Sequence, residues 1–246
     1  MHTVTAVAHR GDPYRFRENT LPSLGSALDR GADAVEVDVR LTRDGVPVLL
    51  HDATLERLWR HDAPLAALRA AEVAELTGGG VPTLAAALTA VAERDAAGEG
   101  ARVLVDLPDA SSATARRVLG VVRDCGAADR VYYCGGAEAM LAVRAADPGA
   151  EIALTWTSLA PPRPVLLDAV SPRWLNYRFS LVDGALAARV HAHGLLLSAW
   201  TPDTRRSMRR LLALGADALT TNRVEILQAL RTGRDGAGPS RARDAG

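Results

Sequence analysis

The sequence predicts an α/β protein made of one domain, a single (β/α)8 TIM barrel with a small insertion after its second strand. Three observations predict this fold. The chain has 246 residues, a length at which one barrel of this kind is common. Short apolar runs alternate with helical patterns in close to eight strand–helix units, enough to close a parallel barrel. Polar side chains follow several of these runs, at the strand ends where α/β proteins carry their chemistry.

The first strand–helix–strand unit is the clearest part of this pattern. Residues 4–8 form a short apolar run, and Thr20 can cap a helix that ends at Gly31. Residues 34–39 then alternate valine with acid. A strand over these residues places all the valines on one face and both acids on the other.

The two acids of this strand, Glu36 and Asp38, have two readings. Neighbouring carboxylates repel each other unless a cation lies between them, and a hard divalent ion is the usual partner. The simpler reading is a half-exposed strand whose acidic face lies in water. The pair alone leaves both readings open.

The rest of the chain continues the alternation. Residues 40–82 are less regular, with an apolar run at 47–50 and a helical piece at 69–76, and form the insertion. We assign 1–232 to the barrel and expect 233–246, which lack an apolar period, to be a disordered tail. A proline-rich loop is expected between the strands at 152–156 and 174–177. The patterns predict further strands at 102–107, 130–134, 195–200 and 218–221, and helices after Thr83 and after Ser111 or Ser112 and at 137–146, 181–193, 204–214 and 223–231.

Two histidines follow apolar runs and have charged neighbours. His9-Arg10 follows the run at 4–8, and His51-Asp52 follows the run at 47–50. If both runs end at one rim of a barrel, two imidazoles, a guanidinium and the acids converge there. Such a set can handle a phosphodiester, because imidazole moves protons near neutral pH while a metal ion and an arginine balance the charge. The other histidines are read as ordinary hydrogen-bonding residues: His2, His61, His191 and His193.

Five short motifs stand in order between residues 9 and 52. They resemble the signature of the glycerophosphodiester phosphodiesterase family. That resemblance implies a metal-dependent barrel enzyme that hydrolyses small glycerophosphodiesters to an alcohol and glycerol 3-phosphate, with Mg²⁺ or Ca²⁺ as cofactor. The motifs are His9-Arg10-Gly11, Glu18-Asn19-Thr20, Gly31-Ala32-Asp33 before Glu36-x-Asp38, Thr42-x-Asp44-Gly45 and His51-Asp52.

The resemblance also implies roles for the two histidines. A glycerol hydroxyl next to the phosphate attacks phosphorus and expels the alcohol, which gives a cyclic phosphate that water then opens. His9 and His51 are the catalytic pair: one accepts a proton and the other donates one to the leaving group. The resemblance does not say which histidine does which.

Further residues match the family by position. Glu36 and Asp38 match metal ligands, and Asp106 stands where a third acidic ligand is expected, although a turn acid is the alternative. Arg10 is implied as the phosphate ligand. Residues expected to orient the site or to wall the pocket, with helix capping or core packing as the alternatives, are Glu18, Asn19 and Trp200.

Two positions depart from the family pattern, which usually has glutamate and, two residues later, lysine. Here these positions are Asp106 and Pro108, and the chain contains no lysine. Loss of one cationic donor can cost about 100-fold in rate. Arg178 is a candidate replacement. The departure motivates two alternative functions, a barrel that binds phosphodiesters with weak or no turnover, and a lyase that releases the cyclic phosphate.

Composition limits the partners. The 29 basic and 29 acidic residues cancel, so no electrostatic case exists for nucleic acid or for an anionic membrane. No apolar run approaches the roughly 20 residues that span a bilayer, and no signal-peptide pattern precedes His9. We expect a cytoplasmic protein without a transmembrane segment; the sequence does not indicate its oligomeric state.

Overall fold

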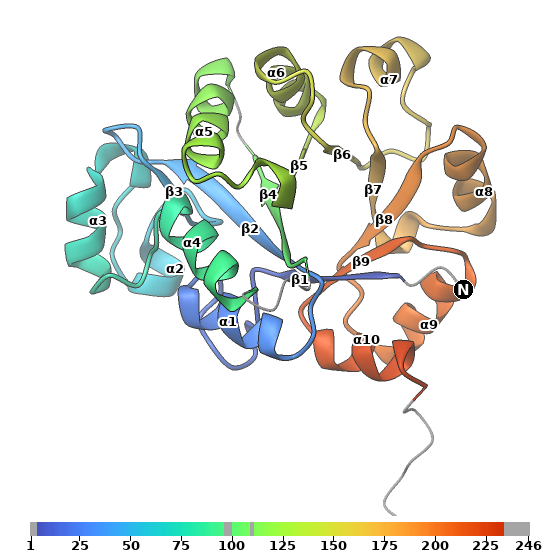
Figure 1. Cartoon of the computed structure of the whole chain (residues 1–246), viewed down its shortest axis with the longest axis horizontal. Coiled ribbons are helices and arrows are strands. Elements are labelled where there is room, and N and C mark those ends of the chain that lie inside the picture. Colours follow the sequence, from blue (N-terminus) through green and yellow to red (C-terminus); the bar gives the residue numbers. More distant parts are fainter. Residues whose placement is uncertain (1–3, 96–99, 109–110, 234–246) are drawn as a thin grey trace, which may run out of the picture.

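Eight parallel strands close into a barrel in the computed structural model, which describes residues 4–95, 100–108 and 111–233 (Figure 1). Their order around the ring is β1-β9-β8-β7-β6-β5-β4-β2, and β2 pairs again with β1. This confirms the predicted (β/α)8 barrel. The ring strands are β1 (Thr5–His9), β2 (Ala34–Leu41), β4 (Arg102–Asp106), β5 (Val131–Gly135), β6 (Ile152–Trp156), β7 (Trp174–Arg178), β8 (Leu196–Trp200) and β9 (Ala218–Thr221).

Helices surround the ring and cover its outer face (Figure 1). Between strands and helices lies one large apolar core, built mostly from alanine, valine and leucine. The covering helices are α1 (Leu21–Asp29), α4 (Leu84–Arg94), α5 (Ser112–Asp124), α6 (Ala137–Ala146), α7 (Pro164–Val170), α8 (Gly184–Ala192), α9 (Arg205–Ala213) and α10 (Val224–Arg231), with short 3-10 turns η2 (Ala128–Arg130) and η3 (Phe179–Leu181).

The inside of the barrel is filled in layers. Its lowest layer belongs to a second apolar cluster that includes Val7, Leu104, Tyr132 and Trp174. Because successive side chains of a strand point to opposite faces, the residue two positions further along each strand forms the next layer up. In β2 this alternation sends the valines to the outer core and both acids to the inside, as the sequence predicts.

The insertion is a small subdomain beside the barrel. It holds β3 (Pro47–Leu49), α2 (Glu56–Trp59), η1 (Leu65–Ala67) and α3 (Ala70–Thr77), drawn on the left of Figure 1. Its own apolar core consists of Val48, Leu50, Leu55, Leu65, Val73 and Val81.

The apolar run at 47–50 is not a strand of the parallel ring. β3 runs antiparallel to β2 in a hairpin, and the Leu50 N–H donates to the carbonyl of Asp38 at 3.0 Å. The turn of the hairpin therefore brings His51 back to the level of the β2 acids. His51 reaches the rim by this return and not as the end of a parallel strand.

Two further segments bear on the sequence expectations. The expected proline-rich loop contains helix α7, which begins at Pro164, where proline fits because the first helical N–H needs no partner. The expected disordered tail lies, from residue 234 onward, outside the described residues.

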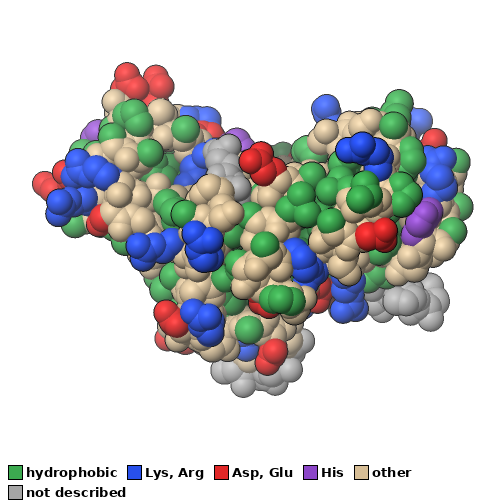
Figure 2. Space-filling view, turned by 90° about the horizontal axis from the view of Figure 1, so that it is seen from above, with side chains coloured by type: hydrophobic (Ala, Val, Ile, Leu, Met, Phe, Trp, Pro, Cys, Tyr) green, Lys and Arg blue, Asp and Glu red, His purple; other side chains and the backbone are tan. Residues whose placement is uncertain are grey.

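Within the described residues, no helix combines the length and hydropathy that crossing a bilayer requires. Figure 2 shows arginines and acids intermixed on the face viewed from above, as the balanced charge predicts.

Candidate active site

A cavity of about 230 Å³ lies inside the carboxyl end of the barrel. Every ring strand contributes at least one side chain to its wall. Seven of the nine predicted site residues line it, and the other two, Glu18 and Asn19, contact the lining residues from behind. The lining residues are His9, Arg10, Glu36, Asp38, His51, Leu104, Asp106, Cys134, Thr155, Asn176, Trp200 and Thr220.

The three acids form a tight cluster at one side of this cavity. Glu36, Asp38 and Asp106 each offer a carboxylate oxygen, and these oxygens lie within 4.8 Å of one another. Burial, followed by the charges of the other two acids, raises the pKa of Glu36 well above its usual value. Burial and then the charge of Asp38 raise the pKa of Asp106 to about 6. Such a cluster of oxygen ligands suits a hard divalent cation, which relieves the repulsion.

Arg10 is held against the acids by an unusual backbone. Its φ is 58°, and its N–H donates to Glu36 Oε2 at 3.0 Å. The guanidinium Nε lies 2.9 Å from Asp38 Oδ2, and Nη1 donates to Glu18 Oε1 at 2.9 Å. Gly11, the next residue, has φ +88°, and a Cβ there would lie 2.4 Å from Ser23 Oγ. The His-Arg-Gly motif therefore needs its glycine for close packing as well as for conformation.

Glu18 and Asn19 connect the β1–α1 loop to the acids and to the insertion. Asn19 donates to Asp38 Oδ2 at 2.7 Å and accepts from the Asp38 N–H at 3.2 Å, at a φ of 56°. Glu18 accepts from Arg10 and also from Arg57 Nη2 of α2 at 2.6 Å. Neither side chain therefore serves only as a helix cap; that task falls to Thr20, which accepts from the Ser23 N–H.

His9 has a fixed tautomer. Its Nδ1 lies 2.8 Å from Asn222 Oδ1, and Asn222 Nδ2 donates to Asp203 Oδ2 at 2.7 Å. A carboxylate only accepts, so Asp203 sets the amide orientation, and Asn222 Oδ1 must accept a hydrogen from His9 Nδ1. Nε2 then carries the lone pair. Burial, and next the charge of Arg10, lower the pKa of His9, so the ring is neutral at pH 7.

His51 is held in a different way. Its Nδ1 lies 2.7 Å from Asp52 Oδ1, and Arg57 Nε donates to Asp52 Oδ2 at 2.5 Å. Burial alone would raise the pKa of Asp52, but the hydrogen bonds from Arg57 and His51 outweigh it and hold this pKa below its usual value. An ionised Asp52 places a hydrogen on His51 Nδ1 and balances the positive charge of a doubly protonated ring.

Several site residues are not predicted by the sequence. Asp203 orients His9 through Asn222, Arg57 orients His51 through Asp52, and no motif marks Asp203 or Arg57. Thr155, Asn176 and Thr220 form the wall opposite the acids; their place follows only from strand parity, since each lies one layer above an inward apolar residue.

The family lysine has no replacement in the cavity wall. Arg178 is exposed and does not line the cavity, and neither does Pro108. Within the described part of the chain, Arg10 is the one arginine that lines it.

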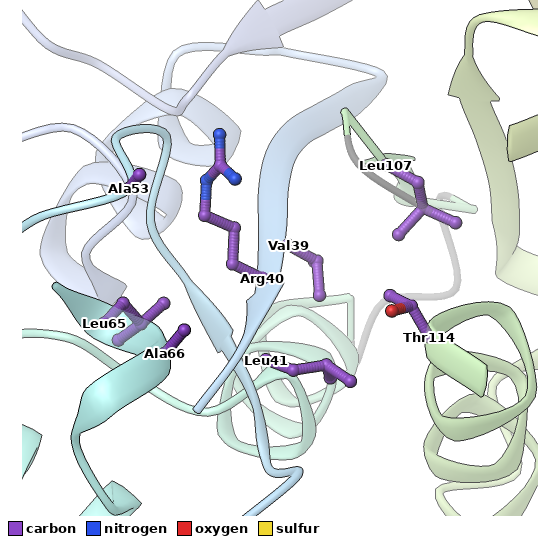
Figure 3. Close-up of a pocket in the computed structure, with 8 residues that line it drawn as sticks. All are labelled: Val39, Arg40, Leu41, Ala53, Leu65, Ala66, Leu107 and Thr114. Atoms are coloured by element: carbon purple, nitrogen blue, oxygen red, sulfur yellow. The ribbon is translucent and has the colours of Figure 1, made fainter. Parts of the chain in front are cut away.

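A second cavity of about 260 Å³ lies outside the ring, between β2, the insertion and α5 (Figure 3). Figure 3 shows Leu107 and Thr114 across a gap from Val39 and Leu41. Val39 and Leu107 are the chain neighbours of Asp38 and Asp106, so they point to the opposite face of the barrel wall. This mostly apolar space is therefore separate from the acids.

Comparisons with known proteins agree with the fold and with the motifs. Residues 9–226 match the model of the glycerophosphoryl diester phosphodiesterase family. The chain is 30% identical over 258 aligned residues to the probable glycerophosphodiester phosphodiesterase 2 of Mycobacterium tuberculosis, covering 91% of this chain and 89% of that protein.

Solved structures share the same barrel. A putative glycerophosphoryl diester phosphodiesterase from Silicibacter pomeroyi superposes with a TM-score of 0.84 at 20% identity, covering 95% of this chain and 94% of that one. A phosphodiesterase from Oleispira antarctica, solved in complex with its product sn-glycerol-3-phosphate, gives 0.80 at 24% identity, covering 92% and 96%. At these identities the likeness shows the fold alone.

Proposed function

The chain belongs to the glycerophosphoryl diester phosphodiesterase family, and from this premise we propose that it hydrolyses glycerophosphodiesters to an alcohol and glycerol 3-phosphate. One observation carries the proposal: a single cavity is lined by two imidazoles, one guanidinium and three clustered carboxylates. This set can bind a phosphodiester anion, and it can move protons on both sides of the phosphorus atom.

A divalent metal ion is part of the proposal. The raised pKa values of Glu36 and Asp106 support it, because three buried carboxylates repel one another without a cation. Glu36, Asp38 and Asp106 would hold the ion, either Mg²⁺ or Ca²⁺. When bound, it supplies positive charge that stabilises the phosphate oxygens. The Nη2 edge of Arg10 adds a second positive charge, since its Nε and Nη1 face Asp38 and Glu18.

The hydrogen bonds support a proposal for the roles of the two histidines, which the sequence leaves open. His9 is the base: its neutral ring presents Nε2, which takes the proton of the glycerol hydroxyl as that oxygen bonds to phosphorus. His51 is the acid: it gives a proton to the oxygen of the departing alcohol as the phosphorus–oxygen bond breaks. Water then opens the cyclic phosphate with the two roles exchanged, which restores both rings.

The direct test is turnover of glycerophosphocholine by the purified protein with Mg²⁺ or Ca²⁺. We expect choline and glycerol 3-phosphate as products, no activity in excess EDTA, and recovery of activity when metal is restored. Absence of product with every divalent ion tried, at high protein concentration, would contradict the proposal.

Pro108 favours a second candidate, a barrel that binds phosphodiesters and turns them over weakly. Among the described residues, no arginine other than Arg10 lines the cavity. No second arginine of the described wall therefore replaces the family lysine. Tight binding of glycerophosphocholine without product over long incubation would support this candidate. A third candidate, a lyase, differs in its product: a cyclic phosphate that persists in the phosphorus NMR spectrum would identify it.

A further inference from the structure

The wall opposite the acids carries three buried polar atoms without a hydrogen-bond partner. They are Asn176 Oδ1, Trp200 Nε1 and Thr220 Oγ1, and all three residues line the active-site cavity. Within the described residues, the other such atoms are Trp59 Nε1 in the insertion and Arg10 Nε, and the latter forms an ion pair with Asp38. Folded proteins pair nearly all buried polar groups, so this cluster calls for a functional reason.

The three atoms come from neighbouring positions of the barrel wall. Their strands β7, β8 and β9 are consecutive in the ring. Trp200 is the register partner of Thr220, and Asn176 pairs with Ser198, two residues before Trp200. Adjacent strands lie about 4.8 Å apart, so one small polar group can reach more than one of these side chains.

Asn176 and Trp200 of this wall lie across the cavity from the acids, and Thr220 lies beside them on β9, next to β1. Around the ring, β7 is four strands from β2, and β8 is four strands from β4. Asn176 is 5% exposed and Thr220 is 3% exposed, so the wall lies deep in the barrel. A phosphodiester held between Arg10 and the acids therefore has room for one small substituent toward this wall, whereas a larger one must point to the mouth.

The chemistry of the wall complements hydroxyl groups. Trp200 Nε1 only donates, and the Thr220 hydroxyl can donate and accept. Asn176 Nδ2 donates to Thr155 Oγ1 at 3.1 Å, which leaves Oδ1 as an acceptor. An alcohol hydroxyl both donates and accepts, so it can pair with this set where an alkyl group leaves it unpaired.

We propose that Asn176, Trp200 and Thr220 form a subsite for the hydroxyl groups of the glycerol unit, which selects phosphates that carry a vicinal diol. The inference rests on the proposed function and names the part of the substrate that the deep wall recognises.

The test compares two ligands that differ only in these hydroxyls, glycerol 3-phosphate and propyl phosphate. Binding is measured by calorimetry at fixed Mg²⁺ for the full-length wild type, Asn176→Leu, Thr220→Val and the control Ser198→Ala. Ser198 is a buried residue of β8 that pairs in register with Asn176 but does not line the cavity. The wild type should bind glycerol 3-phosphate about tenfold more tightly, since unmade hydrogen bonds to buried groups are costly. Asn176→Leu and Thr220→Val should each lose about fivefold or more for glycerol 3-phosphate only.

Two results would overturn the subsite: equal wild-type affinity for both ligands, or equal weakening of both ligands in the variants. If circular dichroism shows that Asn176→Leu does not fold, Thr220→Val and the wild-type comparison decide. Because binding does not require turnover, the test distinguishes failure of the subsite from failure of the proposed function. A wild type that prefers glycerol 3-phosphate but hydrolyses no diester contradicts the proposed function alone, whereas an active enzyme without this preference overturns the subsite alone.

Discussion

At the scale of single residues, the two histidines have opposite surroundings. His9 is half-buried beside a guanidinium and bonds a neutral amide, whereas the side chain of His51 is 45% exposed and pairs with a carboxylate. Burial and the charge of Arg10 lower the pKa of His9, whereas a carboxylate lies beside His51. The sequence predicts both rings at the site. The partner of His51 is the next residue, Asp52, whereas 213 residues separate His9 from its partner Asn222. Local patterns cannot predict such a pairing, because the closure of the barrel creates it.

The amide of Asn222 orients His9 without placing a negative charge beside it. In Asn222→Asp, a carboxylate replaces the neutral acceptor and raises the pKa of His9. Activity needs the neutral ring, so the acid limb of the pH–rate profile should move to higher pH. Asn222→Leu should lower kcat by about 10²-fold or more with little change in KM, because the ring loses its orientation. An unchanged pH profile in Asn222→Asp, with normal folding, would contradict the assignment of His9 as the base.

Asp106 gives a prediction for the metal-free protein. Its folded-state pKa of about 6 lies above the unfolded value, so the folded state binds more protons and stability falls as the pH rises through this range. The substitution Asp106→Asn replaces the carboxyl group with an amide, which carries no charge at any pH. In EDTA, Asp106→Asn and the wild type should melt nearly alike at pH 3.5, where the carboxyl group of Asp106 is mostly protonated in both the folded and the unfolded state, and the variant should melt on the order of 5 °C higher at pH 7.5.

The difference between the two melting temperatures isolates Asp106, because His9 titrates in both proteins. Scanning calorimetry at the two pH values measures it. A variant that is less stable than the wild type at pH 7.5 without metal would show that burial does not raise this pKa.

At the scale of elements, one helix-to-strand turn sequence occurs twice at the base of the barrel. The sequence Gly-Ala-Asp-Ala occurs at 31–34 and at 215–218, each time as a helix-to-strand turn. Asp33 accepts from the Ala6 N–H at 2.6 Å, and Asp217 accepts from the Leu197 N–H at 2.8 Å, so each acid ties its turn to the neighbouring strand. Periodicity and capping residues predict such elements because the interactions involved are local.

Two elements escape this kind of prediction for physical reasons. Helix α7 has only seven residues and a proline-rich approach, too short for a helical period to emerge. The direction of β3 depends on its pairing with β2, which the composition of residues 47–50 does not encode. The sequence alone therefore does not show how His51 reaches the site.

Arg57 tests the coupling between the insertion and the barrel. It joins Glu18 of the β1–α1 loop to Asp52 beside His51. Arg57→Ala should lower kcat/KM about tenfold, because Asp52 and His51 lose their orientation. It should change the melting temperature little, because this side chain is 47% exposed.

Arg43→Ala is the matched control for this prediction. Arg43 belongs to the same insertion, is 51% exposed and pairs with Glu72 away from the cavity. Its loss should leave kcat/KM unchanged. If both variants lost activity equally, the insertion as a whole and not the Arg57 bridge would control the site.

At the scale of the whole molecule, the barrel joins acids, bases and a polar pocket that lie far apart in the sequence. The ring sets the clustered acids on β2 and β4 against the deep wall on β7 to β9, with one histidine on β1 and the other returned by the insertion. The motifs between residues 9 and 52 predict only the half of the site near the acids. The opposite half is built from ordinary strand residues, whose function depends on the closure of the ring.

The most direct test of this arrangement compares two leaving groups in the His9→Ala and His51→Ala variants. Glycerophosphocholine needs an acid to protonate its departing alcohol, whereas the 4-nitrophenyl diester of glycerol 3-phosphate releases a stable phenolate without one. With metal bound, His9→Ala should lose about 10²-fold or more on both substrates. His51→Ala should lose as much on glycerophosphocholine but retain most of its rate of nitrophenolate release in the first turnover on the nitrophenyl ester, before the cyclic phosphate is opened. Equal losses of His51→Ala on both esters, or a His9→Ala variant that still cleaves the nitrophenyl ester at the wild-type rate, would contradict the account.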